Sequence, residues 1–202
     1  MQLIVTDPQQ AAVRAAGLYV DLLRRKPDAV LGLATGSTPL GLYARLAALY
    51  RAGELSFRRA TSFNLDEYVG LPATHSQSYR YFMEHNLFSH VDLPAERTHV
   101  PSGLDVSDVA LAGYDAAIEA AGGIALQLLG LGGNGHIGFN EPGTPFGLGT
   151  HVVELTARTR QDNARFFASR DEVPPHAATM GVKTVMHARA ILLLAFGSAK
   201  AE

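Results

Sequence analysis

Residues 124–131 read Ile-Ala-Leu-Gln-Leu-Leu-Gly-Leu and are apolar at nearly every position. A strand that is buried on both faces has such a continuous run, whereas a strand with one face in water alternates apolar and polar residues. We therefore expect a central strand here, in a sheet that helices cover on both sides. The polar, glycine-rich stretch that follows then begins at the end of this strand.

Shorter apolar runs lie before and after this strand, and segments with apolar residues at helical spacing separate them. Strands interleaved with helices are typical of a mostly parallel sheet in an α/β fold. The predicted strands span residues 3–5, 29–34, 61–65, 152–155 and 191–196. The predicted helices lie between Pro8 and Pro27, between Pro39 and Tyr50, and over residues 76–88, 106–121 and 158–169.

Two of these helices have recognisable start signals. Asp7 offers an N-cap oxygen, and Pro8 suits the first helical position because its missing N–H is not needed there. Thr38 is the candidate cap of the second helix, with Pro39 in its first turn. The first helix is expected to bury the stripe Val13, Ala16, Val20 and Leu23.

The composition bounds the class of protein. With 202 residues, of which 47 % are hydrophobic and 18 % charged, the chain can build one core and is not disordered. A net charge of -2 argues against nucleic acid as the main partner, and the absence of Cys excludes disulfides and a thiolate nucleophile. We see no signal peptide and no apolar stretch of the roughly 18 residues that cross a bilayer, so we expect a soluble cytoplasmic protein.

Parallel sheets bind ligands beyond the carboxyl ends of their strands, so the residues after each apolar run deserve inspection. Thr35-Gly36-Ser37-Thr38-Pro39 follows the strand at 29–34. The free N–H groups of a helix start attract an anion, and Gly36 lets the backbone approach a phosphate closely. No Gly-Lys-Ser/Thr follows, so this is not a Walker loop. The alternative is an ordinary turn before a capped helix.

Two adjacent carboxylates, Asp66 and Glu67, follow the strand at 61–65. A carboxylate that is partly desolvated in a cleft can remove a proton from a carbon next to a carbonyl group. The alternative is turn and cap chemistry, because Asp is common after strands.

The third strand end is the segment 130–143, which holds His136 between Asn134 and Glu141. His is the side chain best placed to move a proton near neutral pH, and a carbonyl or carboxylate on its other nitrogen would fix its tautomer. The glycines formally match a dinucleotide-binding fingerprint, but glycines and prolines within 138–145 prevent the helix that such a loop must open. The alternative is a structural loop with an exposed histidine.

The other histidines lack metal-ligand spacing, so we predict no metal site. His85 and His90 are interpreted as solvated or capping residues.

Taken together, these segments resemble the glucosamine-6-phosphate deaminase family, also called glucosamine-6-phosphate isomerases. The resemblance spans nearly the whole chain, and its most specific blocks are Asp-Glu-Tyr-Val-Gly at 66–70 and Gly-His-Ile-Gly-Phe-Asn-Glu-Pro at 135–142. Further matches are residues 33–39, 78–79, 82–83, 159–160, 163, 165–167, 181–182 and 197–201. The family fold is a Rossmann-like open, mostly parallel α/β sheet with helices on both faces.

The resemblance implies an activity and catalytic roles. Glucosamine 6-phosphate and water would become fructose 6-phosphate and ammonia. His136 would move the proton that opens the sugar ring, with Asn134 and Glu141 orienting it. Asp66 would carry a proton between C2 and C1 of the open chain. Glu67 is assigned no catalytic role and is expected to support local geometry.

The resemblance also implies a phosphate site without any metal or organic cofactor. The matching positions are Gly36, Ser37, Thr38, Arg165 and Lys200. Arg suits a two-pronged grip on phosphate, whereas Lys acts as a point charge. By the residues alone, Arg165 is better explained as a solvated charge on a helix.

Two features depart from the fullest family pattern. Some members have Asp where Asn134 stands, and an amide supports an imidazolium less well, so we expect a lower pKa for His136. The family also continues beyond the position of Glu202, so we expect one C-terminally short domain over 1–202 with an exposed apolar surface. The basic residues of the allosteric site in hexameric members do not stand out around 147–153. We therefore expect an unregulated monomer or low-order homo-oligomer.

Three other functions stay open. 6-Phosphogluconolactonase shares the fold and a similar histidine loop but needs no carbon base, so Asp66 argues against it. A non-catalytic sugar-phosphate sensor would keep Arg165 and Lys200 but could dispense with Asp66 and His136. A dinucleotide-dependent oxidoreductase has only the glycine match in its favour.

Overall fold

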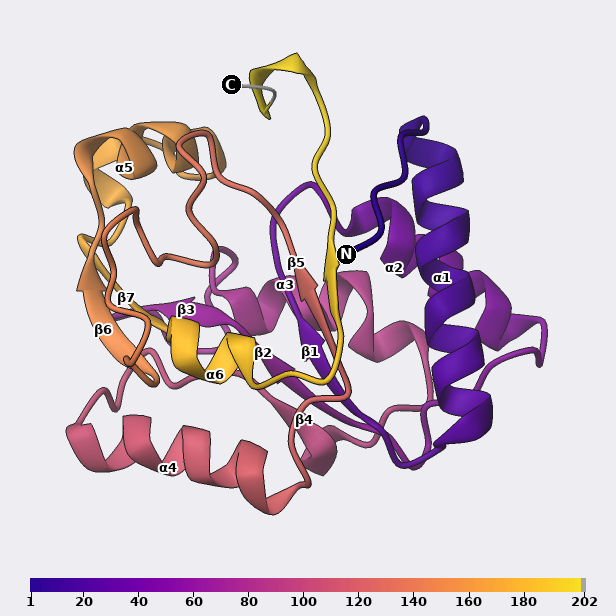
Figure 1. The fold of residues 1–202 in the computed structure, drawn as a ribbon. Coiled ribbons are helices and arrows are strands. Elements are labelled where there is room, and N and C mark those ends of the chain that lie inside the picture. Colours follow the sequence, from indigo (N-terminus) through magenta and orange to yellow (C-terminus); the bar gives the residue numbers. More distant parts are fainter. Residues whose placement is uncertain (201–202) are drawn as a thin grey trace.

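The computed structural model describes residues 1–200, and its centre is a five-stranded parallel sheet. The strand order is β4-β2-β1-β5-β8, so β1 and β5 occupy central positions and are buried at every residue. Figure 1 shows α1 and α2 together on one side of the sheet and α4 and α6 on the other. The strands are β1 (Val30–Leu33), β2 (Thr61–Asn64), β4 (Thr98–His99), β5 (Leu126–Leu129) and β8 (Ile191–Leu193). The predicted α/β class is therefore confirmed.

A second sheet of three antiparallel strands, in the order β3-β7-β6, extends from the first. Its strands are β3 (Asp66–Tyr68), β6 (His151–Glu154) and β7 (His176–Thr179). The strand expected near 152–155 thus exists but lies outside the parallel sheet. Neither β3 nor β7 is among the predicted strands, because β3 follows β2 after one residue and the sequence of β7, His-Ala-Ala-Thr, has little β-propensity.

Six α-helices and five short 3-10 helices complete the described part of the chain. The α-helices are α1 (Pro8–Arg25), α2 (Leu40–Arg51), α3 (Tyr79–Asn86), α4 (Asp108–Ala120), α5 (Ala157–Asn163) and α6 (Val182–Met186). The 3-10 helices are η1 (Phe88–His90), η2 (Ala95–Arg97), η3 (Ala164–Phe166), η4 (Arg170–Glu172) and η5 (Ser198–Lys200). The helix predicted over 158–169 is in fact α5 followed by η3. None of these helices is long and apolar enough to cross a membrane.

Helix α1 begins as predicted and buries Ala16 and Leu23 of the predicted stripe, while Val20 packs against the core. The Asp7 carboxylate accepts a hydrogen bond from the N–H of Gln10 at 2.9 Å, and Pro8 is the first helical residue. Val13, however, is 47 % exposed, and the buried stripe is Ala12, Ala15, Ala16, Tyr19 and Leu23. Alanines on this face allow α1 and α2 to pack closely.

Two local predictions are wrong. Residues 3–5 form no strand, because no neighbouring strand among residues 1–200 offers them a hydrogen-bonding partner, and Leu3 and Val5 are exposed. Thr38 does not cap α2: the N-cap position is Pro39, without a side-chain hydrogen bond. The chain turns through residues 37–39, and the Tyr43 N–H then bonds the Pro39 carbonyl to begin the helix.

Two apolar side chains of β8, at the edge of the parallel sheet, are exposed. In β8, Ile191 is 40 % and Leu193 is 46 % exposed. Leu192, between them, packs against the core.

Gly32 of β1 packs directly against the side chain of Gln127 in the neighbouring strand β5. A Cβ at Gly32 would lie 2.1 Å from Oε1 of Gln127, which is fully buried in β5. We expect Gly32→Ala to lower the free energy of unfolding by about 1–3 kcal/mol through overpacking. Gly17→Ala in α1 is the matched control, because nothing lies within 4 Å of a Cβ there, and it should stabilise by about 0.5–1 kcal/mol. Equal effects of the two substitutions in urea unfolding would contradict this packing.

Candidate active site

A cleft of about 650 Å³ opens at the carboxyl ends of the parallel strands. Its walls are the segments that follow β1, β2, β5 and β8, together with parts of α3, α5 and η3. The structure thus brings together strand ends that are far apart in the sequence. The predicted site residues that line this cleft are Gly36, Ser37, Thr38, Asp66, His136, Arg165 and Lys200.

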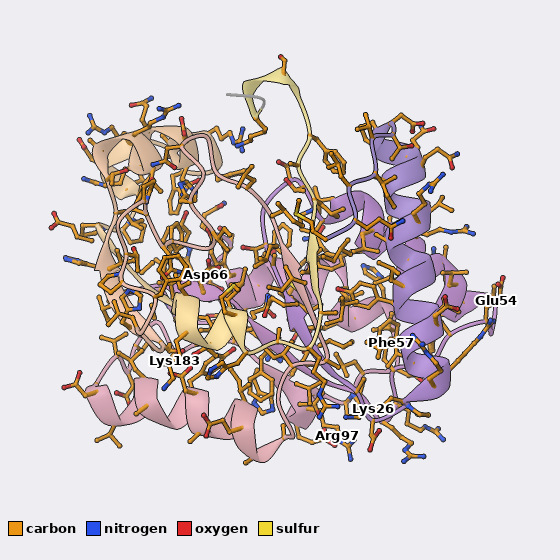
Figure 2. The ribbon with its side chains drawn as sticks, in the orientation of Figure 1. Lys26, Glu54, Phe57, Asp66, Arg97 and Lys183 are labelled. Atoms are coloured by element: carbon orange, nitrogen blue, oxygen red, sulfur yellow. The ribbon has the colours of Figure 1, made fainter. Side chains whose placement is uncertain are left out.

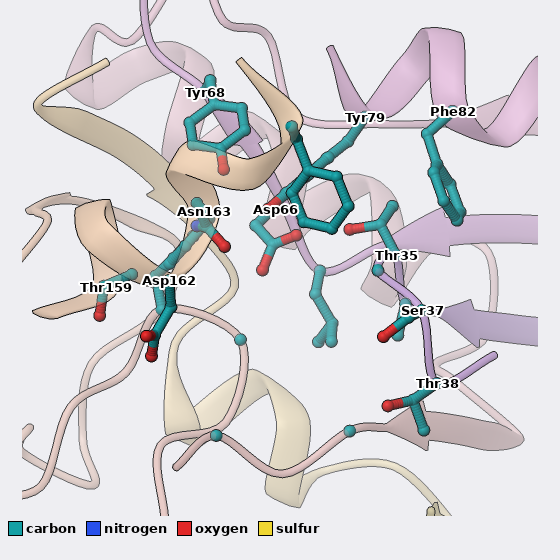
Figure 3. Close-up of a pocket in the computed structure, with 18 of the residues that line it drawn as sticks. Thr35, Ser37, Thr38, Asp66, Tyr68, Tyr79, Phe82, Thr159, Asp162 and Asn163 are labelled. Carbon is teal, nitrogen blue, oxygen red and sulfur yellow. The ribbon is translucent and has the colours of Figure 1, made fainter. Parts of the chain in front are cut away.

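Asp66 lies deep in the interior, where β3 leaves the parallel sheet, whereas Glu54 and Arg97 lie at the surface (Figure 2). The residue is only 5 % exposed, and its carboxylate points into the space between the 35–38 loop and α5 (Figure 3). Burial, and secondarily the neighbouring Glu67 carboxylate, raises the pKa of Asp66 to about 8. Among residues 1–200, no hydrogen bond opposes this shift. Such a group can gain and lose a proton near neutral pH.

Glu67, the adjacent carboxylate, is also buried but accepts several hydrogen bonds. Its Oε1 accepts hydrogen bonds from the N–H groups of Tyr68 and Tyr79, both at 2.8 Å, and its Oε2 accepts one from Arg80 N–H at 3.0 Å. Burial raises the pKa of Glu67, and these three hydrogen bonds counteract the rise. The carboxylate thereby holds the start of α3 against β3, which agrees with a structural role.

His136 lies in a loop that its own hydrogen bonds keep in shape. The Nδ1 atom of His136 lies 2.8 Å from Oδ1 of Asn134, and the loop closes through a bridge between Ile137 and Asn140. An amide oxygen can only accept, so in the neutral imidazole Nδ1 carries the proton and Nε2 keeps its lone pair. A Cβ at Gly132 would lie 2.3 Å from Nε2. The glycine at 132 therefore makes room for the imidazole.

Asn134 and Glu141 lie behind His136 rather than in the cleft lining. The Nδ2 group of Asn134 donates to Oε2 of Glu141 at 2.5 Å, and this oxygen is 3.9 Å from Nδ1 of His136. Burial lowers the pKa of His136, while the Glu141 charge raises it and Lys200 lowers it further. The net shift is downward. At neutral pH His136 is thus mostly an uncharged base.

The predicted phosphate-binding residues line the cleft from three segments: Gly36, Ser37 and Thr38 lie in the loop after β1, Arg165 in η3 and Lys200 in η5. Gly36 has φ +89°, a left-handed conformation that suits glycine and shapes the turn after β1. The guanidinium of Arg165, in η3, lies 4.7 Å from the centre of the Phe166 ring. Within the described chain, neither Arg165 nor Lys200 forms an ion pair with a carboxylate. Both cations are therefore available to an anion in the cleft.

Sequence reasoning missed most of the aromatic floor of the cleft. The rings of Tyr68 and Tyr79 lie 4.9 Å apart, and those of Tyr79 and Phe139 stack at 6.1 Å. Asp162 and Asn163 of α5 also line the cleft and were not singled out as acting on a ligand. Only the resemblance, which includes Tyr79, Phe139 and Asn163, carried a signal for this region. No group of three or more His, Asp or Glu side chains in residues 1–200 is arranged to hold a metal ion.

Comparison with known proteins identifies related chains over nearly the full length. Residues 8–202 match the family described as "Glucosamine-6-phosphate isomerases/6-phosphogluconolactonase". A glucosamine-6-phosphate deaminase of Rhodopirellula baltica is 54 % identical over 201 residues, covering 98 % of this chain and 80 % of that protein. A glucosamine-6-phosphate deaminase of Geobacillus sp. (strain WCH70) is 52 % identical over 194 residues, covering 96 % of this chain and 77 % of that protein.

Solved structures agree with this relationship. A monomeric glucosamine-6-phosphate deaminase of the NagB superfamily superimposes with a TM-score of 0.93 at 43 % identity, covering 96 % of this chain and 81 % of its own. A 6-phosphogluconolactonase from Thermotoga maritima superimposes with a TM-score of 0.75 at 21 % identity, covering 99 % of this chain and 85 % of its own. At that identity, the second likeness shows the fold alone.

The amide at position 134 allows a test of the histidine's electrostatics. Asn134→Asp places a carboxylate 2.8 Å from Nδ1, and an adjacent negative charge favours the imidazolium. We expect the pKa of His136 to rise by about 1 unit or more, measured by NMR titration of its ring protons. Because the neutral base then forms only at higher pH, any activity that needs it shifts the same way. Gln161→Glu adds the same charge on an exposed part of α5 and is the control. An equal shift in both variants would contradict a specific contact.

Proposed function

The chain belongs to the family of glucosamine-6-phosphate isomerases and 6-phosphogluconolactonases, and we propose that within it this protein is a glucosamine-6-phosphate deaminase. The reaction converts glucosamine 6-phosphate and water to fructose 6-phosphate and ammonia. One observation supports this choice above the others. Within residues 1–200, a carboxylate that accepts no hydrogen bond and a neutral imidazole line the same cleft as two cations that form no ion pair.

The first step of the proposed mechanism opens the sugar ring. Nε2 of His136 takes the proton of the C1 hydroxyl group, the bond between C1 and the ring oxygen breaks, and the same proton passes to the ring oxygen. This transfer needs an imidazole that is uncharged at the start and whose Nδ1 holds the other proton. The hydrogen bond from His136 to Asn134 meets this need, and Glu141 stabilises the transient imidazolium.

The second step moves a proton along the open chain. The Asp66 carboxylate removes the proton from C2, which is acidic because it lies next to the C1 aldehyde and carries the amino group. The C1 oxygen takes up a proton from water, which gives an enolamine. Return of the C2 proton from Asp66 to C1 then converts this enolamine to an iminium ion at C2. Water adds to this carbon, ammonia leaves, and the C2 ketone of fructose 6-phosphate remains. A carboxylate whose pKa is about 8 is a stronger base than an ordinary one.

The phosphate would bind at the loop that follows β1. Ser37 and Thr38 lie across the cleft from α5 (Figure 3), and Gly36 lets the backbone come close. Arg165 and Lys200 add positive charge at the same cleft. Anchoring the substrate by its phosphate leaves C1 and C2 free to meet His136 and Asp66.

The alternative functions explain less of the site. Lactone hydrolysis removes no proton from carbon, so it gives no role to the buried Asp66 carboxylate. A sensor would need neither Asp66 nor His136 in a reactive state. We also propose that the protein is a monomer or low-order homo-oligomer that acts in the cytoplasm, and the solved relative is described as monomeric.

Ammonia release tests the assignment directly. We expect the 202-residue chain to release ammonia from glucosamine 6-phosphate, with kcat/KM rising as the pH approaches about 8 and Asp66 loses its proton. Asp66→Asn should lower kcat by a factor on the order of 10²–10⁴, the usual contribution of a general base. Calorimetry should still detect fructose 6-phosphate binding to this variant. Asp21→Asn, at an exposed position of α1, is the control. Lactone hydrolysis without ammonia release would refute the proposal.

The phosphate contact of Arg165 makes a separate prediction. Arg165→Ala should raise KM for glucosamine 6-phosphate about ten- to hundredfold, because a charge-assisted hydrogen bond contributes about 1.5–3 kcal/mol. Any turnover of unphosphorylated glucosamine should not change. Arg170→Ala, in η4 and outside the cleft lining, should leave both substrates unaffected. A rise in KM of the same size for glucosamine itself would show that Arg165 does not bind the phosphate.

A further inference from the structure

The hydroxyl of Thr159, in helix α5, contacts the Glu141 carboxylate that lies beside His136 and Asn134. Thr159 lies in the first turn of α5 and is only 5 % exposed. Its Oγ1 donates to Oε1 of Glu141 at 2.9 Å. The same Oγ1 lies 2.9 Å from Oγ1 of Thr156, the N-cap residue of α5.

The directions of these hydrogen bonds follow from the carboxylate. An ionised Glu141 can only accept, so Thr159 must donate its hydroxyl proton to it. The Thr159 oxygen is then left to accept the hydroxyl proton of Thr156, whose own oxygen accepts the Thr159 N–H at 3.1 Å. Thr156 also approaches Glu141 itself, at the longer distance of 3.3 Å.

The chain of hydrogen bonds continues from Glu141 to the imidazole. Oε2 of Glu141 accepts from the amide of Asn134, which turns the Asn134 oxygen towards Nδ1 of His136. That oxygen requires a proton on Nδ1, and the lone pair therefore stays on Nε2. If Glu141 rotated, the amide of Asn134 would lose the acceptor that fixes its orientation. The tautomer of His136 thus depends on how firmly Glu141 is held.

We propose that Thr159 is a positioning residue for His136: its hydroxyl holds Glu141 in the rotamer that orients Asn134 and keeps Nε2 of His136 unprotonated. This inference rests on the proposed function, because it assigns Thr159 to the ring-opening step. Outer partners that fix a histidine's tautomer act in the same way at other sites. The pKa of Glu141 is lowered although burial opposes this, with Asn134 and Thr159 as the main causes, which agrees with a firmly bonded carboxylate.

Substitution of Thr159 by Val and by Ser separates the hydroxyl from the packing of the side chain. Val keeps the shape and removes the hydroxyl, whereas Ser keeps the hydroxyl and removes the methyl group. We expect Thr159→Val to lower kcat about tenfold with KM within about twofold of wild type, as for the loss of one hydrogen bond to a charged group. Thr159→Ser should recover most of this loss. Thermal unfolding checks that both variants fold.

NMR of the imidazole gives a readout that does not depend on turnover. With ¹⁵N-labelled histidine, at a pH above the pKa of His136, the wild-type ring should be in the form protonated at Nδ1. Thr159→Val should convert it to a mixture of both tautomers, and Thr159→Ser should restore the wild-type spectrum. An unchanged tautomer in Thr159→Val, or a Ser variant as impaired as the Val variant, would overturn the proposal. If the wild type releases no ammonia, the proposed function fails while the tautomer measurement still decides the role of Thr159.

Discussion

The hydrogen bonds at Leu65 set the geometry on which the site depends. Its N–H donates to the carbonyl of Leu33, which continues the parallel sheet, and its carbonyl accepts from the N–H of Met180, beyond β7. One buried residue therefore joins the two sheets. The next residue, Asp66, is placed at their junction, where it is desolvated and faces the cleft. The raised pKa of this carboxylate is a consequence of that position.

The two neighbouring carboxylates show how surroundings divide the work between identical groups. Glu67 receives three backbone hydrogen bonds and secures α3, whereas the Asp66 carboxylate receives none from the described chain. Because successive residues of a strand point to opposite sides, one carboxylate faces the cleft and the other faces the start of a helix. The carboxylate proposed as the base and the carboxylate that secures α3 thus occupy adjacent positions of β3.

In the loop that holds His136, hydrogen bonds fix the orientation and the tautomer of the imidazole. Glycine at position 132 leaves space for the imidazole. Glu141 accepts a hydrogen bond from the amide of Asn134, whose oxygen keeps the proton of the neutral imidazole on Nδ1. Helix α5 then holds Glu141 through Thr159. The acid–base groups proposed for ring opening and for proton transfer at carbon therefore come from separate segments of the chain.

Much of this arrangement follows from local sequence. Continuous apolar runs predicted the buried parallel strands, Asp7 with Pro8 predicted the start of α1, and the prolines and glycines after β5 predicted a loop in place of a dinucleotide-binding helix. Those features depend on burial of whole strands and on residues close in sequence. The second sheet, the absence of a strand at 3–5 and the different surroundings of Asp66 and Glu67 depend on partners far along the chain. Only the tertiary structure decides them, because β pairing, desolvation and hydrogen bonding at a buried site are set by which distant segments meet.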